Sequence, residues 1–100
     1  MNFSEKVYEL CRKIPKGKVT TYKELGKALG GKRQVYRAVG RALNTNPYSP
    51  NVPCHRVVCY DGKIGWFAKG VKKKIAMLEK EGVKVVDGKI VDFEKVLWKF

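Results

Sequence analysis

Two short amphipathic segments, separated by a pair of glycines, constrain the fold of this chain more than any other feature. Residues 21–24 have the pattern of a capping box, in which Thr21 caps a helix and Glu24 reaches back to its first turn. Gly30 and Gly31 would end that helix, and apolar periodicity predicts a second helix at about Arg33 to Leu43. Two short helices joined by a glycine turn are typical of a helix-turn-helix. The positions expected to face inward are Leu25, Ala28, Leu29, Val35, Ala38, Val39 and Ala42.

A regular row of arginines lies on the second predicted helix. Arg33, Arg37 and Arg41 are spaced at i, i+4 and i+8, so they share one helix face. Ala38 and Gly40 are small and would leave that face open to close approach. An ordinary helical hairpin with a solvated basic face would show the same spacing. We favour contact with DNA, because basic side chains gathered along one helix are typical of a nucleic-acid interface.

A further helix is predicted before this pair. Apolar residues recur at helical spacing from Phe3 to Ile14, after a possible Ser4 cap, so this helix would end before Pro15. A turn over 15–18 and an extended pair at 19–20 would lead into the capping box. Cys11 lies on the apolar face of this helix and is interpreted as a core residue.

The second half of the chain is predicted to contain two hairpins and two helices. A loop over 44–53 leads to Cys54, and a hairpin turn is expected at Asp61-Gly62. A helix over 69–81 would present Val71, Ile75 and Leu78 to the core and stop at Gly82. A second hairpin is expected around Asp87-Gly88, followed by a capped short helix from Asp92 to Trp98. The expected fold class is mainly α with short β-hairpins, a helix-turn-helix, winged-helix-like DNA-binding domain.

The charge balance indicates a polyanionic partner. The 100 residues contain 22 Lys and Arg against 9 Asp and Glu, a net charge of +13, which favours phosphate backbones. A lysine-rich surface serving solubility or thermostability is the alternative, but such surfaces tend to bring Glu along with Lys, and Glu is scarce here. No apolar run approaches the roughly 20 residues that span a bilayer, and no signal-peptide pattern is present. We therefore expect an intracellular protein, cytoplasmic or associated with the nucleoid.

A cysteine beside the only histidine provides the candidate chemistry. Cys54 and His55 are adjacent, and a cysteine attacks as its thiolate, which a neighbouring histidine can generate by taking the proton. A protonated His55 would in turn favour the thiolate. The three cysteines, an odd number, indicate free thiols. Cys54, His55 and Cys59 lack the paired spacing of structural zinc, and no cofactor is expected.

Several segments together resemble one known family. Ile14-Pro15-Lys16-Gly17-Lys18-Val19-Thr20-Thr21-Tyr22, Arg37-Ala38-Val39-Gly40, Asn46-Pro47 and Pro53-Cys54-His55-Arg56-Val57-Val58 resemble the C-terminal domain of the O6-alkylguanine-DNA alkyltransferases. The similarity covers roughly residues 3–83. The tail, Val83 to Trp98, is more similar to that of the small alkyltransferase-like proteins, which usually carry tryptophan in place of the nucleophile.

The resemblance implies a self-alkylating repair reaction. Cys54 would take the alkyl group from O6 of guanine irreversibly, and His55 would relay its proton through water. Glu81 would orient and charge-balance His55, and Asn46 would brace the turn. The partner would be double-stranded DNA containing O6-alkylguanine, with the modified nucleotide extruded from the duplex.

The resemblance also implies which residues contact the DNA and the base. Arg37 would enter the base stack in place of the extruded nucleotide, and Tyr22 would crowd the 3′ phosphate and donate to the base ring. The expected DNA-binding residues are Thr21, Tyr22, Lys23, Arg33, Arg37, Ala38, Gly40, Arg41 and Arg56. The expected pocket residues are Tyr22, Val57, Val58, Trp66, Phe67 and Ala68.

The chain departs from the family pattern in two respects. Phe67, Ala68 and Lys69 occupy positions where many alkyltransferases have a tyrosine and a serine, although the backbone N–H of Ala68 could still donate to O6. Residues 1–100 are expected to form one domain, with the family's N-terminal domain absent, and to act as a monomer. Cys59 is interpreted as a buried strand residue.

Two other functions remain open at the level of the sequence. A non-enzymatic sensor would bind alkylated DNA and recruit another repair pathway; the length and the tail favour it, whereas Cys54 opposes it. A plain helix-turn-helix regulator would bind a specific sequence, with no preference for alkylated sites.

Overall fold

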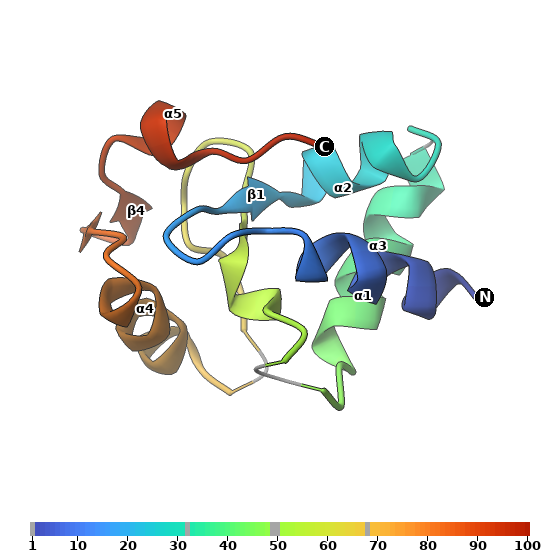
Figure 1. Ribbon diagram of the computed structural model, residues 1–100, viewed down its shortest axis with the longest axis horizontal. Coiled ribbons are helices and arrows are strands. Elements are labelled where there is room, and N and C mark those ends of the chain that lie inside the picture. The colour runs from blue at the N-terminus through green and yellow to red at the C-terminus, as the bar shows by residue number, and fades with distance from the viewer. Residues whose placement is uncertain (1, 32, 49–50, 68) are drawn as a thin grey trace.

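The computed structural model describes residues 2–31, 33–48, 51–67 and 69–100. The described chain contains five α-helices and four two-residue strands. Figure 1 shows their arrangement. In order they are α1 (Phe3–Arg12), β1 (Thr20–Thr21), α2 (Tyr22–Ala28), α3 (Arg33–Asn44), the 3-10 turn η1 (Cys54–Arg56), β2 (Val57–Val58), α4 (Val71–Lys80), β3 (Val85–Val86), β4 (Lys89–Ile90) and α5 (Phe93–Val96). The mainly helical fold class is therefore confirmed.

Helix α1 packs across α3. Asn2, rather than Ser4, caps α1, because its side-chain oxygen accepts the backbone N–H of Glu5 at 2.9 Å. Tyr8 is buried and donates its hydroxyl to the carbonyl of Ala42 on α3 at 2.8 Å. Cys11 is fully buried on the same face, as expected, and burial raises the pKa of its thiol to about 12.

The helix-turn-helix is formed by α2 and α3, and Thr21 caps α2 by accepting the backbone N–H of Glu24 at 3.0 Å. The prediction that Ala28 faces inward is wrong, because Ala28 is exposed and Gly26 is buried instead. The ring of Tyr36 on α3 lies against Gly26, where a Cβ atom would come within 2.1 Å of Cε1. The absence of a side chain at Gly26 therefore lets the two helices pack closely.

The strands behind the helix-turn-helix pair differently from the prediction. β1 and β2 pair in parallel, with Thr20 opposite Val57 and Thr21 opposite Val58. The expected hairpin over 57–64 does not form as two paired strands; its turn is held by the Cys59 N–H donating to the Lys63 carbonyl at 2.9 Å. Lys63 forms an isolated antiparallel bridge to Lys89. The second expected hairpin is confirmed, since β3 and β4 pair in antiparallel register around 87–88.

Helix α4 buries a different stripe from the predicted one. Leu78 is fully buried and Ile75 partly so, but Val71 is exposed and Lys74 is buried in its place. Lys74 can lie there because its ammonium donates to two backbone carbonyls.

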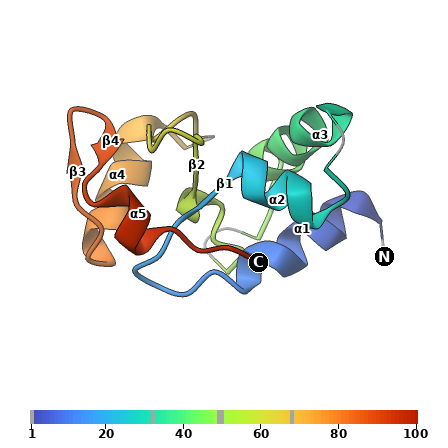
Figure 2. The ribbon, with the colours of Figure 1, turned by 90° about the horizontal axis from the view of Figure 1, so that it is seen from above.

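The C-terminal segment ends in an extended stretch rather than a long helix. α5 has only four residues, and no side-chain cap from Asp92 is found within the described chain, since the Asp92 backbone is left-handed (φ 54°). From α5 the chain runs alongside β1 toward the start of α2 (Figures 1 and 2), with Leu97 bridged in parallel to Val19. No helix in the described residues has both the length and the apolar character needed to cross a bilayer.

Two buried clusters fill the interior. The first packs α1, α2 and α3 around Leu25 and Val39, and the second packs α4 and the β3–β4 hairpin around Val58 and Leu78. Cys54 and Val57 belong to the first cluster and Val58 to the second. The segment 54–58 therefore passes between the two halves of the core.

Candidate active site and DNA-binding surface

Cys54 begins the η1 turn at the end of a braced loop. Asn46 donates from Nδ2 to the carbonyl of Val52 at 3.0 Å, and its Oδ1 accepts the backbone N–H of Tyr48 at 2.9 Å. The Cys54 N–H donates to the Val52 carbonyl at 2.8 Å. Cys54 retains 8% of its surface exposed. Asn46 therefore holds the backbone that delivers a nearly buried thiol.

His55 is bound to a carboxylate from the end of α4. Its Nε2 lies 3.1 Å from Oε1 of Glu81. Arg56 makes a bidentate pair with the same carboxylate, from Nε to Oε1 at 2.9 Å and from Nη2 to Oε2 at 2.5 Å. Burial raises the pKa of Glu81, but hydrogen bonds from Arg56 and His55 outweigh it, so the pKa lies below its usual range. Glu81 is therefore a carboxylate at neutral pH.

His55 is neutral in this environment, as a histidine that is to accept a proton must be. The residue is only 2% exposed, and burial lowers the pKa of His55 more than the hydrogen bond and charge of Glu81 raise it. With Glu81 ionised, Nε2 carries the proton and donates, and Nδ1 is then the acceptor of the ring. Nδ1 is buried and has no hydrogen-bond partner within the described residues.

A solvent-accessible cavity of about 470 Å³ borders the group formed by His55, Arg56 and Glu81. It is lined by Lys16, His55, Arg56, Met77, Lys80 and Glu81. The His55 side chain is thus almost fully buried, but it borders a cavity that water can enter.

Lys74 is a buried cation that the sequence analysis missed. It is 0% exposed, and its Nζ donates to the carbonyl of Val57 at 2.7 Å and of Trp66 at 3.2 Å. Burial lowers the pKa of Lys74 to about 8. The negative charges of the Cys59 and Cys54 thiolates offset part of this lowering. The sequence did contain a signal for this burial. Lys74 falls on the same helical face as Val71, Ile75 and Leu78, and a lysine on an otherwise apolar face must find hydrogen-bond partners when it is buried.

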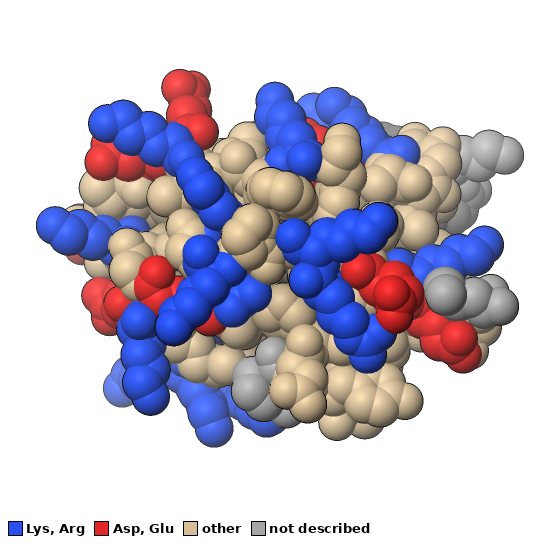
Figure 3. Space-filling model, viewed as in Figure 1, with Lys and Arg blue, Asp and Glu red and all other residues tan. Residues whose placement is uncertain are grey.

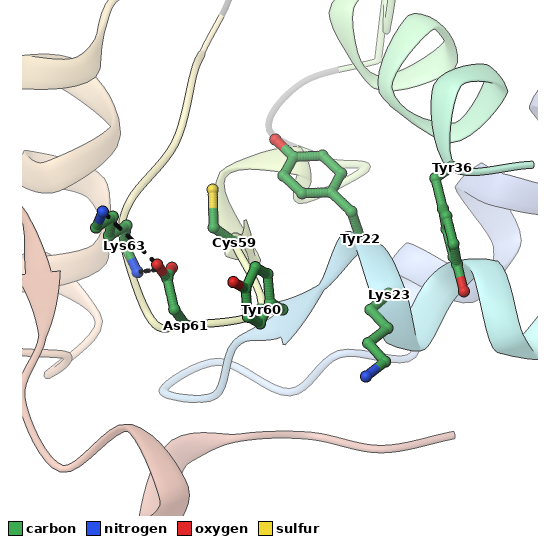
Figure 4. Close-up of a pocket in the computed structure, with 7 residues that line it drawn as sticks. All are labelled: Tyr22, Lys23, Tyr36, Cys59, Tyr60, Asp61 and Lys63. Carbon is green, nitrogen blue, oxygen red and sulfur yellow. Dashed lines mark hydrogen bonds and ion pairs between the residues drawn. The ribbon is translucent and has the colours of Figure 1, made fainter. Parts of the chain in front are cut away.

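Tyr22 and the loop after β2 enclose a second cavity of about 420 Å³. It is lined by Tyr22, Lys23, Tyr36, Cys59, Tyr60, Asp61 and Lys63. Figure 4 shows Cys59 and Tyr22 reaching into this space from two separate chain segments, with Tyr36 on α3 beyond Tyr22. We call it the tyrosine cleft. Burial, together with the charges of the nearby cysteines, raises the pKa of Tyr22 to about 12, so its hydroxyl remains a donor at neutral pH.

Cys59 differs from the predicted buried strand residue. It lies beyond β2, is only partly buried, and lines the tyrosine cleft. A Cβ added at Gly65 would come within 3.0 Å of the Cys59 sulfur and 3.9 Å of the Tyr22 ring. The glycine therefore permits close contact between the loop and the tyrosine.

The predicted pocket residues have contrasting environments. Val57 and Val58 are fully buried and Phe67 is nearly so, whereas the Trp66 side chain is 56% exposed. Ala68 lies outside the described residues. Trp66 is thus available at the surface, whereas the side chains of Val57 and Val58 are enclosed in the core.

The predicted DNA-binding residues fall into three groups. Lys23, Arg37 and Arg41 are exposed, and Ala38 and Gly40 are half-buried on α3; no described atom lies within 4 Å of a Cβ built at Gly40. Thr21 is buried and caps α2. The Arg33 side chain lies outside the described part of the chain, although Arg33 begins α3.

Arg56, predicted to bind DNA, has partners within the protein, and its contact with DNA stays a prediction. All three of its guanidinium nitrogens donate within the protein, two to Glu81 and Nη1 to the carbonyl of Ile14 at 2.8 Å. The buried carboxylate needs a counter-charge, and Arg56 supplies it. Elsewhere, Lys and Arg side chains spread over the whole visible face of the molecule instead of forming one patch (Figure 3).

The fold is that of a helix-turn-helix DNA-binding domain, in which a nearly buried cysteine directly precedes a carboxylate-bound histidine. A family model described as "6-O-methylguanine DNA methyltransferase, DNA binding domain" matches residues 2–83. The chain belongs to this family.

Individual relatives agree with the family assignment. The methylated-DNA–protein-cysteine methyltransferase of Thermococcus kodakarensis is 49% identical over 83 residues, which cover 82% of this chain and 45% of that protein. OGT of Mycobacterium tuberculosis, solved in complex with DNA, has a TM-score of 0.75 at 36% identity over 81% of this chain and 50% of that chain. The chain spans about half the length of the curated relatives it matches.

One solved structure is similar over almost the whole chain. Atl1 of S. pombe, in complex with damaged DNA containing O6-carboxymethylguanine, has a TM-score of 0.83 at 31% identity, covering 98% of this chain and 95% of that chain. The similarity therefore includes the tail beyond residue 83. That the chain acts as a single domain and as a monomer stays a prediction.

Proposed function

We propose that this protein repairs DNA by transferring an alkyl group from O6 of a modified guanine to its own Cys54. The observation that carries the proposal is a nearly buried thiol directly before a histidine whose Nε2 is bound to a carboxylate, in a helix-turn-helix domain. Relatives that share 48–49% identity over most of this chain are named methylated-DNA–protein-cysteine methyltransferases.

The first step would be removal of the thiol proton. Neutral His55 has its basic nitrogen at Nδ1, because Nε2 donates to Glu81, so Nδ1 would accept the proton of Cys54 through water. The proton could then reach solvent through the cavity that His55 and Glu81 line.

A positive charge is needed beside the thiolate once His55 has passed its proton to solvent, because the imidazole is then neutral again. Lys74 is a buried cation beside this segment, because its Nζ donates to the carbonyl of Val57, three residues after Cys54. In a medium of low dielectric such an interaction is far stronger than in water. We assign the electrostatic support of the thiolate to Lys74 in place of His55.

The transfer itself would be a displacement at the alkyl carbon. A bond forms between the Cys54 sulfur and that carbon as the bond from carbon to O6 breaks, and the electron pair stays on the guanine. The base then gains a proton on its ring and becomes ordinary guanine. The Tyr22 hydroxyl, which the raised pKa keeps protonated, would donate a hydrogen bond to the purine as charge develops. The thioether product does not regenerate a thiol, so each molecule would act once.

The helix-turn-helix would present the damaged nucleotide to this site. A base inside the duplex cannot align its O6 substituent with the sulfur, so the nucleotide must be extruded at a cost of a few kcal/mol. Arg37 is exposed on α3 and would occupy the vacated position, while Lys23 and Arg41 would bind phosphates. Ala38 and Gly40 would allow the helix to approach the groove closely.

The decisive experiment is the mass of the peptide that carries Cys54. A duplex with O6-methylguanine should add one methyl group to this peptide and leave the Cys11 and Cys59 peptides unchanged. Cys54→Ser serves as the matched control, and unmodified duplex as the substrate control. Folded protein that binds the modified duplex without acquiring the methyl group would exclude the transfer reaction.

The sensor hypothesis has one observation in its favour, the similarity to Atl1 over the whole chain. In cells exposed to a methylating agent, Cys54→Ala would retain protection if the protein were only a sensor. We expect protection to be lost, because the presence of Cys54 gives the site its chemistry.

A further inference from the structure

Residues 84–100 lie beyond the segment matched by the family model, which ends at residue 83. They contain the β3–β4 hairpin, α5 and the extended end of the chain. We call them the C-terminal strap. The strap contacts two segments that come from different parts of the sequence, β1 and the loop 59–64.

The first contact fixes β1, which directly precedes Tyr22. The Val19 N–H donates to the carbonyl of Val96 at 2.9 Å, and the Trp98 N–H donates to the carbonyl of Val19 at 2.6 Å. The Thr20 hydroxyl donates to the carbonyl of Trp98 at 2.9 Å. The strap thus adds a neighbour to β1 on the edge that β2 leaves free, and Figure 1 shows this stretch running beside β1.

The second contact fixes the loop after β2. The Ile90 N–H donates to the carbonyl of Gly62, and the Ile64 N–H donates to the carbonyl of Gly88, each at 2.9 Å. Phe93 lies over Gly62, where a Cβ atom would be 3.2 Å from its ring. Ile64 and Ile90 share the second buried cluster, against which Phe93 packs.

These two segments are the opposite walls of the tyrosine cleft. Tyr22 and Lys23 follow β1 on one side, and Cys59, Tyr60, Asp61 and Lys63 belong to the loop on the other. Since β1 and β2 contain only two residues each, their own ladder is short. Within the described chain, the strap hydrogen-bonds both to residues 19–20, which lead into Tyr22, and to the loop 59–64.

We propose that the C-terminal strap sets the separation of the two cleft walls and so positions Tyr22 against the alkylated nucleotide. This inference rests on the proposed alkyl transfer. Phe93 and Trp98 are then positioning residues, which act through Tyr22 and the loop. The strap would supply within this short chain a rigidity that the family-matched segment alone does not provide.

The test uses Phe93→Ala and Trp98→Ala, with Phe100→Ala as the matched control at an exposed aromatic residue of the same strap. Transfer of the methyl group at saturating duplex should slow by about 10- to 100-fold in the first two variants, the range for a small misplacement of a reacting partner. Affinity for unmodified duplex should not change, because the exposed arginines of α3, Arg37 and Arg41, lie outside the strap. Trp98→Phe should restore most of the rate.

A second readout does not depend on alkyl transfer. In a Cys54→Ser background, the rate of Cys59 alkylation by iodoacetamide, followed on its peptide, should rise severalfold in Phe93→Ala and Trp98→Ala but not in Phe100→Ala. Measurements are made at a temperature where the circular dichroism of each variant matches that of the parent. Unchanged Cys59 labelling would overturn the inference even if the wild type transfers methyl groups, whereas increased labelling with no transfer by the wild type would count against the proposed function alone.

Discussion

Oε1 of Glu81 lies 3.1 Å from Nε2 of His55, although the two residues are 26 positions apart. This contact determines which ring nitrogen is basic, because the Nε2 proton is held by the carboxylate and Nδ1 is left as the acceptor. Arg56 completes the arrangement by neutralising the same carboxylate. The candidate reaction therefore depends on a hydrogen-bonded group that no contiguous motif contains.

Replacing the carboxylate should slow transfer. Glu81→Gln keeps the shape of the side chain but weakens its hold on the His55 proton and leaves Arg56 without a counter-charge. We expect the single-turnover rate to fall by about 10- to 100-fold, the usual effect of removing a carboxylate behind a functional histidine. Glu79→Gln, exposed on the same helix, is the control. Equal rates in both variants would show that Glu81 does not orient the histidine.

The single histidine should make stability depend on pH. In the unfolded chain its pKa is the ordinary 6.5, whereas the pKa of His55 in the folded protein is lower. The unfolded state therefore binds more protons as the pH falls, so stability is lost on acidification. Urea unfolding between about pH 7 and about pH 5.5 should show this loss in the wild type and not in His55→Gln. Parallel curves would mean that His55 titrates normally.

Lys74→Met should separate stability from reactivity. The lowered pKa of Lys74, from 10.5 to about 8, corresponds to a burial cost of about 3 kcal/mol. Loss of the ammonium leaves the carbonyls of Val57 and Trp66 unpaired, at about 1–3 kcal/mol each. These effects oppose each other, so we expect the free energy of unfolding to change by no more than about 2 kcal/mol.

The transfer rate of Lys74→Met should nevertheless fall at neutral pH and recover as the pH is raised, because the thiolate has lost its cation. Lys74→Arg keeps the charge and should retain more of the rate, and exposed Lys73→Met is the matched control. A pH–rate profile identical to that of the wild type would remove Lys74 from the mechanism.

The two exposed arginines of α3 should affect DNA binding in different ways. Arg41→Ala should weaken binding equally for modified and unmodified duplex and reduce the slope of log K against log salt by about 1. Arg37→Ala should reduce repair more than binding, since it loses the side chain that fills the stack. Arg12→Ala is the control, because Arg12 is an exposed arginine on α1 that pairs with Glu9. Equivalent behaviour of Arg37→Ala and Arg41→Ala would contradict a special role for Arg37.

Gly26→Ala should destabilise the helix-turn-helix, because the new methyl group would overlap the ring of Tyr36. A cost of about 1–3 kcal/mol is typical of such overpacking. Combining it with Tyr36→Ala should cost less than the sum of the two single changes, which a double-mutant cycle in urea would measure. Strict additivity would show that the two residues are not in contact.

The amino-acid sequence by itself determined the local structure and the chemical identity of the site. The Thr21 cap, the glycine turn and the turn at Asp87-Gly88 depend on residues a few positions apart, so their patterns can be read directly. The adjacency of Cys54 and His55 is likewise present in the chain. The error at Ala28 arose instead from packing between two helices, since the ring of Tyr36 on α3 lies against Gly26 and makes it the buried position.

Only the tertiary structure decided how distant segments meet. The Thr20 hydroxyl reaches the Trp98 carbonyl across 78 positions, and Lys74 is buried because two carbonyls from other segments accept its protons. Arg56 was expected at the DNA but is needed to balance a half-buried carboxylate. Such pairings are selected by the desolvation of charges and backbone groups in the assembled core, and local periodicity does not identify the partner that each buried group will find.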